Sequence, residues 1–390
     1  MNVVVTGIGL VSALGALEST WSRLLAGHSG IQIYQPFVEL DPKPLGLIGQ
    51  YPAQLEDLTH QVVLDAIADA HLTLPLPDCA VVVGSSRGNQ SQWEGFAKIH
   101  SPHLASLLSD PLGRGAGRSS RLTGWLDSLP HAAAIATARL IGTGAAVRSP
   151  MAACATGLWA IAQGYDLIRA GDCERVIVGA VEAPITPLTM TGFDQMGALA
   201  STGAFPFDCD RQGLVLGEGG AVLVLESEAV ARQRAVKLYG RIAGFGLTAD
   251  GFHVSAPEPG SRAAIAAVTQ CLQRSHLQPG DIHLIHAHGT ATRLNDQNEA
   301  HLIQTLFPAH VPITSTKGAT GHAIGASGAL GVAFCLLALQ HQRLPPTIGL
   351  NHPEFDLNFV KCAQSAPIQH ALCFGFGFGG QNAAIALSAV

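Results

Sequence analysis

The chain has 390 residues, of which 47% are hydrophobic and 13% are charged, and its formal net charge is −6 at pH 7. With so little charge and 44 glycines, much of the chain must lie in an interior with close backbone packing. The one basic cluster, Arg114, Arg118 and Arg121, is too small to form the electrostatic footprint of a nucleic-acid-binding protein, so the composition excludes that class.

The first half of the chain alternates predicted strands and helices. Residues 2–15 predict a buried strand that enters a glycine-rich turn, and because this strand follows the first Met at once we expect no targeting segment. Apolar residues recur at helical spacing over residues 53–71. Residues 85–130 are polar and predict an irregular insertion. The other predicted elements are strands at 80–84, 175–180 and 220–225, a helix at 132–140 and an extended run at 147–151.

Cys154 lies where this extended run passes into a predicted helix. Pro150 disfavours helix before it, and the helical pattern after Cys154 continues to Gly171, a typical helix end. We therefore expect the helix dipole to lower the pKa of the thiol and to favour the nucleophilic thiolate. Ala153 and Ala155 leave room for a covalent intermediate. The other seven cysteines include no CxxC pair and are expected to be inert, reduced thiols in the cytoplasm.

The second half of the chain repeats the alternation. Its predicted elements are a strand from 238 to 248, a helix at 261–274, a strand at 282–287, a helix at 296–306, an extended run at 312–315, a helix at 323–339 and a final strand pair ending at 388. The helix at 323–339 is uncharged but shorter than the roughly 20 residues that span a membrane, so we expect a buried helix and no membrane insertion. Two similar halves predict a pseudo-duplicated α/β fold with the site where the halves meet.

Polar residues of the second half stand at the ends of these predicted elements. His288 follows a buried strand, and Lys317 and His322 precede an uncharged helix that has no packing reason to begin with them. A zinc site made of His286, His288 and His322 is an alternative, but no carboxylate is obviously placed to support it, and we favour a site without metal. Residues 374–382 alternate Phe and Gly, so their backbone N–H groups could hold an oxyanion; a glycine-rich β turn is the structural alternative.

Together, these segments resemble the β-ketoacyl-[acyl-carrier-protein] synthases, and most closely the elongating synthase I/II type with a Cys-His-His site. The resemblance runs from residue 3 to residue 388. The motifs, in the order of the family, are AACATG (152–157), PFDCDRQGLVLGEGG (206–220), AHGTATRLND (287–296), TKGATGH (316–322) and FGFGGQN (376–382). The resemblance implies a thiolase-like α/β fold, with halves at 1–240 and 241–390 in an α-β-α-β-α layered arrangement.

The resemblance also implies a role for each matching residue. Cys154 corresponds to the nucleophile that holds the acyl chain as a thioester. The other roles are His288 and His322 for malonyl decarboxylation and enolate stabilisation, Lys317 beside them with Glu299 as its acidic partner, Thr290 and Thr292 for the phosphopantetheine arm, Phe378 as the gating ring with Phe376 supporting it, and the backbone N–H groups of Cys154 and Phe378 as the oxyanion hole. The reaction implied is decarboxylative Claisen condensation with malonyl-ACP, which elongates fatty acids by two carbons.

The resemblance implies no cofactor, an acyl carrier protein as partner, a homodimer and a cytoplasmic location. Two positions depart from the family: Leu129-Pro130-His131 replaces an Asn-Met pair, and Gly197 replaces a carrier-docking arginine. Residues 85–130 also match poorly, which leaves a specialised polyketide or glycolipid ketosynthase as an alternative. A non-catalytic chain-length-factor-like subunit is disfavoured because Cys154 is present. We expect Arg114, Arg118 and Arg121 to contact the acidic carrier.

Overall fold

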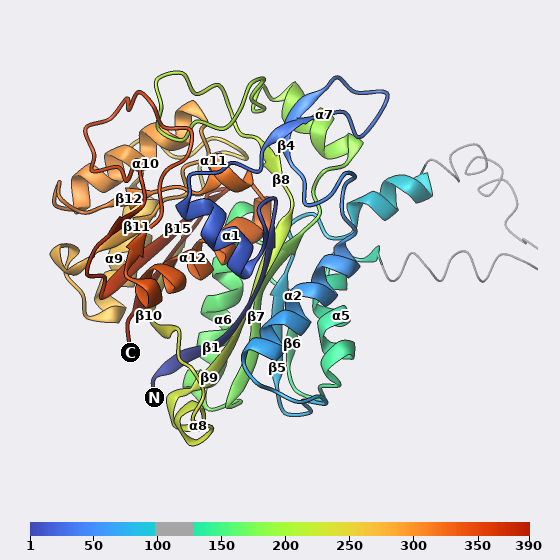
Figure 1. Cartoon of the computed structure of the whole chain (residues 1–390), viewed down its shortest axis with the longest axis vertical. Helices are drawn as coiled ribbons and strands as arrows, with labels where there is room; N and C mark the ends of the chain where they lie inside the picture. Colours follow the sequence, from blue (N-terminus) through green and yellow to red (C-terminus); the bar gives the residue numbers. More distant parts are fainter. Residues whose placement is uncertain (98–127) are drawn as a thin grey trace, which may run out of the picture.

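The computed structural model describes residues 1–97 and 128–390, and an 11-stranded sheet lies at its centre (Figure 1). The first half of the chain supplies, in spatial order, β6 (Val147–Arg148), β5 (Ala80–Gly84), β7 (Arg175–Glu182), β9 (Gly219–Ser227) and β1 (Val3–Ser12). The second half continues the sheet with β10 (Gly240–Ala249), β16 (Gln381–Ser388), β15 (His370–Gly377), β11 (Leu284–His286) and β12 (Ile313–Thr314). The short strand β2 (Gly15–Ala16) pairs with the end of β1.

The two half-sheets, one from each half of the chain, have the same topology. In the first half-sheet, β9 pairs antiparallel with β1 and with β7, and β5 pairs parallel with β7 and with β6. In the second half-sheet, β16 pairs antiparallel with β10 and with β15, and β11 pairs parallel with β15 and with β12. The half-sheets meet where β1 pairs antiparallel with β10, with Val3 opposite Ile242. The predicted pseudo-duplicated α/β fold is confirmed, and its division into 1–240 and 241–390 stays a prediction.

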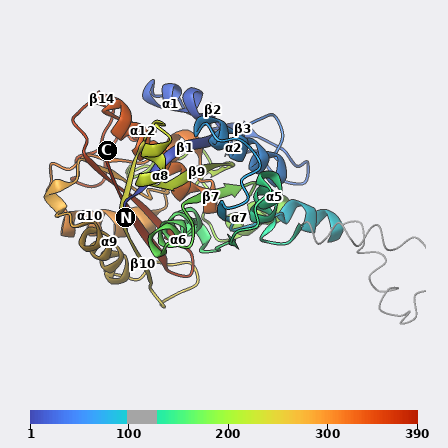
Figure 2. The ribbon, with the colours of Figure 1, turned by 90° about the horizontal axis from the view of Figure 1, so that it is seen from below.

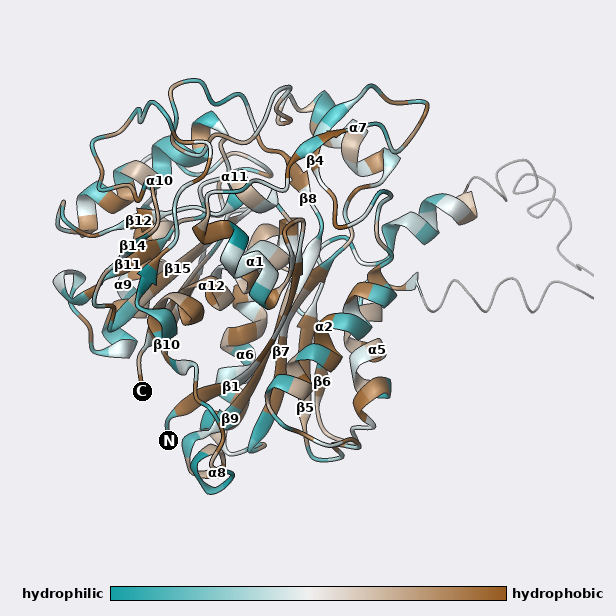
Figure 3. Ribbon diagram, viewed as in Figure 1, coloured by the Kyte–Doolittle hydropathy of each residue, from teal (hydrophilic) through white to brown (hydrophobic). Residues whose placement is uncertain are grey.

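Helices form three layers around the two half-sheets (Figures 1 and 2). In the outer layers, α2 (Leu55–Asp69) and α5 (Ala132–Ile141) pack against the first half-sheet, and α9 (Arg262–Ser275) and α10 (Arg293–Leu306) pack against the second. The middle layer consists of α6 (Thr156–Ala170) and α12 (Ser327–His341), which contact each other and both half-sheets. The order is therefore α-β-α-β-α. Apolar residues follow the central strands, whereas α10 at the periphery is largely hydrophilic (Figure 3).

Glycines in the two central strands let the outer helices come close to the sheet. A Cβ at Gly9 of β1 would lie 1.8 Å from the carbonyl oxygen of Val62 in α2. A Cβ at Gly246 of β10 would lie 1.8 Å from the carbonyl oxygen of Ala267 in α9. No side chain fits at these distances. In both halves, a glycine in the central strand therefore allows the equivalent helix to pack closely against the sheet.

The helix α12 is a core element, as predicted. The stretch Ile324–His341 has a mean hydropathy of 1.5 and the length of a membrane span, but 89% of it is buried inside the fold. The α-helix begins at Ser327 rather than at 323, because Ile324–Ala326 forms a 3₁₀ turn, η4, in which Ile324 has a φ of 37°. This left-handed backbone conformation cannot continue an α-helix.

Several short elements were not predicted, because runs of two to nine residues give too little periodicity to recognise. The helices are α1 (Leu17–Leu25), α7 (Pro187–Gln195), α8 (Glu228–Gln233) and α11 (Lys317–Thr320). The strands are β3 (Gln32–Tyr34), β4 (Lys43–Gly46) and β8 (Leu216–Gly217) in one small sheet, and β13 (Arg343–Leu344) with β14 (Gln364–Ser365) in another.

The segment 85–130 differs from the expected irregular insertion in the parts that are described. Residues 85–87 are held by hydrogen bonds to Glu182, and a helix runs from residue 90 to residue 97. Arg114, Arg118 and Arg121, the expected carrier contacts, lie outside the described residues.

Candidate active site

Cys154 lies in a 3₁₀ turn, η2 (Ala153–Ala155), directly before α6. Ala153 has a φ of 46°, in the left-handed region that non-glycine residues rarely adopt. The Thr156 hydroxyl closes the turn, since it accepts from the Ala152 N–H at 2.9 Å and donates to the Ala153 carbonyl at 2.7 Å. These bonds hold the strained turn in place. Cys154 is only 6% exposed.

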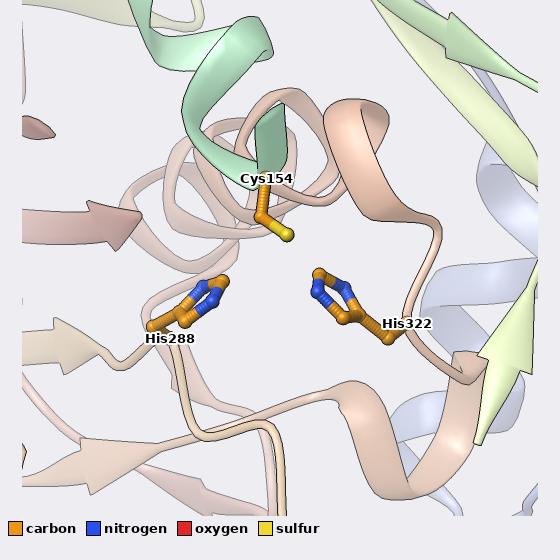
Figure 4. Close-up of side chains that lie close together, drawn as sticks. All are labelled: Cys154, His288 and His322. Atoms are coloured by element: carbon orange, nitrogen blue, oxygen red, sulfur yellow. The ribbon is translucent and has the colours of Figure 1, made fainter. Parts of the chain in front are cut away.

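Two histidines from the second half of the chain meet Cys154. His288 follows β11, and His322 lies between α11 and η4. The Cys154 sulfur and one ring nitrogen of each histidine all lie within 4.8 Å of one another. Figure 4 shows the sulfur pointing into the space between the two imidazoles, whose centroids are 5.3 Å apart at an interplanar angle of 83°. Residues of three separate sequence motifs thus form one cluster.

Both imidazoles are neutral. Burial is the main reason that the pKa values of His288 and His322 lie well below 6.5, and the ammonium of Lys317 lowers both further. His322 Nδ1 lies 2.8 Å from the hydroxyl oxygen of Ser327, so Nε2 is the nitrogen left for the cavity. A neutral imidazole offers one donor and one acceptor, which allows both hydrogen bonding to an anion and uptake of a proton.

The pKa of the Cys154 thiol differs from the expectation. Burial raises its pKa to about 11, whereas the Lys317 ammonium, the Phe378 N–H and Arg87 act in the opposite direction. Burial therefore outweighs the predicted lowering at the helix start. The resting thiol is protonated, and its attack on a substrate needs a proton acceptor nearby.

Lys317 and Glu299 both bind the backbone of His288. The Lys317 ammonium donates to the His288 carbonyl oxygen. The Glu299 carboxylate accepts from the N–H groups of His288 at 2.6 Å and of Gly289 at 2.7 Å. Burial lowers the pKa of Lys317 and raises that of Glu299 to about 7, and each charge opposes the shift of the other. Lys317 and Glu299 are thus linked through the backbone of His288.

The Phe-Gly loop at the end of β15 lies directly beside the cysteine. The backbone N–H of Phe378 lies near the Cys154 thiol and acts against the rise of its pKa. The Phe378 ring packs against Phe193 of α7 with centroids 6.0 Å apart, and the Phe376 ring lies 5.9 Å from the His288 ring. The loop therefore offers a backbone donor at the sulfur and an aromatic wall at the histidine.

A cavity of about 470 Å³ leads from the surface to these groups. Its lining includes Cys154, His288, His322, Thr290, Thr292, Phe376 and Phe378. The hydroxyls of Thr290 and Thr292 are 2.8 Å apart, and Gly197 and the exposed Arg293 also line the cavity. Lys317 and Glu299 lie behind His288, outside this lining. The structure therefore brings every predicted site residue either to the cavity or to the backbone of His288.

The three-histidine alternative is wrong. His286 points away from the cluster, with Nε2 3.1 Å from the Thr316 hydroxyl and Nδ1 near the Cys373 thiol. Cys154, His288 and His322 are nevertheless a donor set that zinc can use. The buried Lys317 ammonium opposes a second cation at this place. Use of the site without a metal stays a prediction.

Two residues with contacts in the site were missed by sequence reasoning. Ser327 binds His322, and Glu182, at the end of β7, binds the turn that contains Gly325. A signal for Glu182 existed, because a charged residue that ends an apolar strand resembles the placement of His288. Ser327 gave no signal beyond its position five residues after His322.

Two family models match the chain. The model described as the N-terminal domain of β-ketoacyl synthase matches residues 53–231, and the model of its C-terminal domain matches residues 239–351. The chain belongs to the β-ketoacyl synthase family. The resemblance inferred from its motifs is thereby confirmed, and so is its assignment as an acyltransferase of the synthase I/II type.

Relatives within this family align along nearly the whole chain. The 3-oxoacyl-[acyl-carrier-protein] synthase 2 of Mycobacterium tuberculosis is 35% identical, over 98% of this chain and 96% of the relative. The mitochondrial 3-oxoacyl-[acyl-carrier-protein] synthase of Arabidopsis thaliana is 29% identical, over 100% and 93%. A solved structure of a type II polyketide ketosynthase, bound to a hexaketide and in complex with its acyl-carrier protein, matches with a TM-score of 0.90 at 27% identity, over 100% and 99%. The thiolase-like fold expected for this β-ketoacyl synthase is therefore confirmed.

Proposed function

We propose that this β-ketoacyl synthase joins an acyl chain held on Cys154 to the two-carbon unit of malonyl-ACP, with loss of CO₂. One observation carries the proposal: a buried thiol and two neutral imidazoles lie within 4.8 Å of one another at the end of a cavity. This set suits a reaction that needs first a nucleophile and then donors for a developing negative charge. The residue roles below are part of the same proposal.

The first half-reaction transfers the acyl group. The Cys154 sulfur attacks the thioester carbonyl of the incoming acyl carrier, the new S–C bond forms and the carrier thiol leaves. Because the resting thiol is protonated, its proton passes to a neutral imidazole and then to the departing thiolate. The N–H groups of Cys154 and Phe378 stabilise the oxyanion of the tetrahedral intermediate. The Phe378 N–H lies near the sulfur and favours its anionic form, which supports this role.

The second half-reaction breaks the bond between the malonyl carboxylate and its α-carbon. CO₂ departs, and the electron pair becomes an enolate on the thioester, which the N–H donors of His288 and His322 stabilise. Each preorganised donor of this kind is typically worth about 3–4 kcal/mol. Burial lowers the pKa values of both imidazoles and keeps them neutral, and the Lys317 ammonium adds to this effect. The carbanion then attacks the Cys154 thioester, the new C–C bond forms and the cysteine thiolate is released.

The cavity suits a long, narrow prosthetic arm. Thr290 and Thr292 line it between the surface and the reacting groups, where their hydroxyls can bind the amides of a phosphopantetheine arm. Arg293 is exposed and follows Thr292 directly, so its charge can face the phosphodiester or the acidic surface of a carrier protein. The related polyketide ketosynthase is in complex with its acyl-carrier protein, which supports the same class of partner here.

We also propose a homodimer in the cytoplasm. The cysteines of the described residues are all free thiols, which suits a reducing compartment. The one apolar helix of membrane-spanning length in the described part of the chain is buried in the fold, so no membrane role is proposed for it.

A specialised polyketide ketosynthase is the second candidate. It performs the same chemistry on a different chain, and the polyketide ketosynthase complex described above supports it. Cys154 and both histidines oppose a non-catalytic subunit.

A condensation assay tests the proposal. The wild type is incubated with acyl-ACP and malonyl-ACP, and product two carbons longer is expected. Cys154→Ala is expected to make no product while keeping the melting temperature of the wild type. Condensation by the alanine variant at the wild-type rate would remove Cys154 from the mechanism. Comparing fatty acyl with polyketide donors in the same assay separates the two candidates.

A further inference from the structure

Glu182 is a fully buried carboxylate that no ion pair neutralises within residues 1–97 and 128–390. Five donors surround it instead. They are the Ser85 hydroxyl at 2.6 Å, the Ser86 N–H at 2.8 Å, the Ser86 hydroxyl at 2.7 Å, the Arg87 N–H at 2.9 Å and the Gly325 N–H at 3.0 Å. A buried charge is tolerated only when such bonds replace its hydration, so this arrangement is built rather than incidental.

The five donors come from both halves of the fold. Residues 85–87 follow β5 in the first half, whereas Gly325 lies in η4 of the second half. A Cβ at position 325 would lie 2.6 Å from a Glu182 carboxylate oxygen, so only glycine allows this approach. Glu182 therefore fastens the loop after β5 to the turn before α12.

This turn is the counterpart of the nucleophile turn. Both η2 and η4 precede a middle-layer helix, and both contain a non-glycine residue at positive φ, Ala153 at 46° and Ile324 at 37°. Ile324 belongs to the apolar cluster that surrounds Cys154. His322 and Ser327, which bind each other, lie on either side of η4. A shift of η4 would thus move the imidazole and the wall of the thiol together.

The second half of the fold uses a carboxylate in a similar way. Glu299 accepts from the consecutive N–H groups of His288 and Gly289, in the loop after β11. Glu182 accepts from the consecutive N–H groups of Ser86 and Arg87, in the loop after β5. Since β5 and β11 hold equivalent places in the duplicated sheet, each half carries a buried clamp on the same loop.

We propose that Glu182 is a positioning residue of the condensing site, which holds η4 so that His322 and Ile324 keep their places against Cys154. This inference rests on the proposed roles of Cys154 and His322. Glu182 acts through the Gly325 backbone and touches no substrate.

Glu182 also contributes to the charge that the thiol experiences. Lys317 and Arg87 lower the pKa of Cys154, Glu182 raises it, and the imidazoles of His288 and His322 are neutral. Removal of the Glu182 charge should therefore favour the thiolate and move alkylation of Cys154 to lower pH. Loss of fold would also lower this pKa, because it removes the burial that raises it, so the profiles are compared only for variants that keep the melting temperature of the wild type.

The test compares Glu182→Gln with Ser85→Ala. The glutamine keeps the size but removes the charge and one acceptor, whereas the alanine removes one donor and keeps the charge. Malonyl-ACP decarboxylation is measured per acylatable Cys154, so that unfolded protein is not counted. For Glu182→Gln we expect kcat to fall on the order of 10- to 100-fold, with KM changed by less than about threefold, as for a misplaced catalytic group. Its Cys154 alkylation profile should move to lower pH. Ser85→Ala should lose less kcat and keep the wild-type profile.

Each outcome decides the inference. A folded Glu182→Gln variant with the wild-type kcat, or with an unshifted alkylation profile, overturns it. If that variant does not fold, Ser86→Ala takes its place: a several-fold loss of kcat at constant KM supports the inference, and the wild-type kcat overturns it. Failure of the wild type to decarboxylate malonyl-ACP would instead contradict the proposed function, so the two failures are distinguishable.

Discussion

His322 Nδ1 lies 2.8 Å from the hydroxyl oxygen of Ser327, five residues further along the chain. This bond fixes the ring so that Nε2 faces the cavity that holds the Cys154 sulfur. Because Ser327 is the first residue of α12, the orientation of the imidazole depends on the turn that starts the core helix. Ser327 thus sets the geometry of His322, the residue to which the proposed mechanism assigns enolate stabilisation.

Replacement of Ser327 by alanine should therefore slow decarboxylation. Loss of a typical hydrogen bond of about 1 kcal/mol corresponds to a roughly fivefold to tenfold lower kcat, with little change in the KM for malonyl-ACP. Ser388→Ala is a matched control, because the Ser388 hydroxyl pairs with His370 Nδ1 at 2.9 Å away from the cavity. Equal kcat values for the two variants would contradict the role given to Ser327.

Alkylation of Cys154 should remain slow at neutral pH. Burial raises the pKa of the thiol to about 11, so the rate of reaction with iodoacetamide should rise about tenfold per pH unit well above pH 8. The rate is followed by peptide mass spectrometry, with the exposed Cys209 and Cys362 as references in the same digest. A rate that levels off below pH 8 would contradict this account.

Lys317→Met tests whether the Lys317 ammonium limits the rise in the pKa of Cys154. The Lys317 ammonium lowers the pKa of Cys154, so its loss should raise that pKa and slow alkylation at every pH below the midpoint. The imidazoles should shift in the same sense, because the same charge lowers their pKa values. Faster alkylation in the methionine variant would show that the sign is wrong.

Much of the fold was predictable because the buried elements are long and periodic. The helix α2, the strand β5 and the core helix α12 all follow from apolar spacing. Cys154, His288 and His322 were predictable from the motifs that flank them. The direction of the Cys154 pKa shift was not, because it depends on burial by residues that lie far apart in the sequence, such as Leu45, Phe193 and Ile324. Glu182 was missed for the same reason, because its position became apparent only from its hydrogen bond with Gly325, which is distant in the sequence.

The close packing of the central strands predicts that replacement by alanine changes the stability of the fold very differently at two glycines. Gly246→Ala places a Cβ 1.8 Å from the Ala267 carbonyl oxygen and should destabilise the fold by about 1–3 kcal/mol or more. Gly192→Ala is the control, because Gly192 lies exposed in α7 with no atom within 4 Å of an added Cβ. That change should be neutral or stabilise by up to about 1 kcal/mol. Urea unfolding measures both, and equal midpoints would contradict the packing argument.

Arg293 should contribute to carrier binding. Gly197 has no charge where the family often has a docking arginine, and Arg293 is exposed on the same cavity. Arg293→Glu should raise the apparent KM for acyl-ACP roughly tenfold and leave the KM for acyl-pantetheine nearly unchanged. Arg232→Glu in α8 is the control, because it makes the same charge change away from the cavity. A rise in KM for both substrates would assign Arg293 to a different task.

The central claim is that Cys154 carries the growing chain. Intact-protein mass spectrometry after incubation with acyl-ACP tests this claim directly, followed by peptide mapping and by addition of malonyl-ACP. We predict a mass increase equal to one acyl group, located on Cys154, which disappears with malonyl-ACP as product two carbons longer forms. An adduct on another residue, or an adduct on Cys154 that malonyl-ACP does not discharge, would contradict the account.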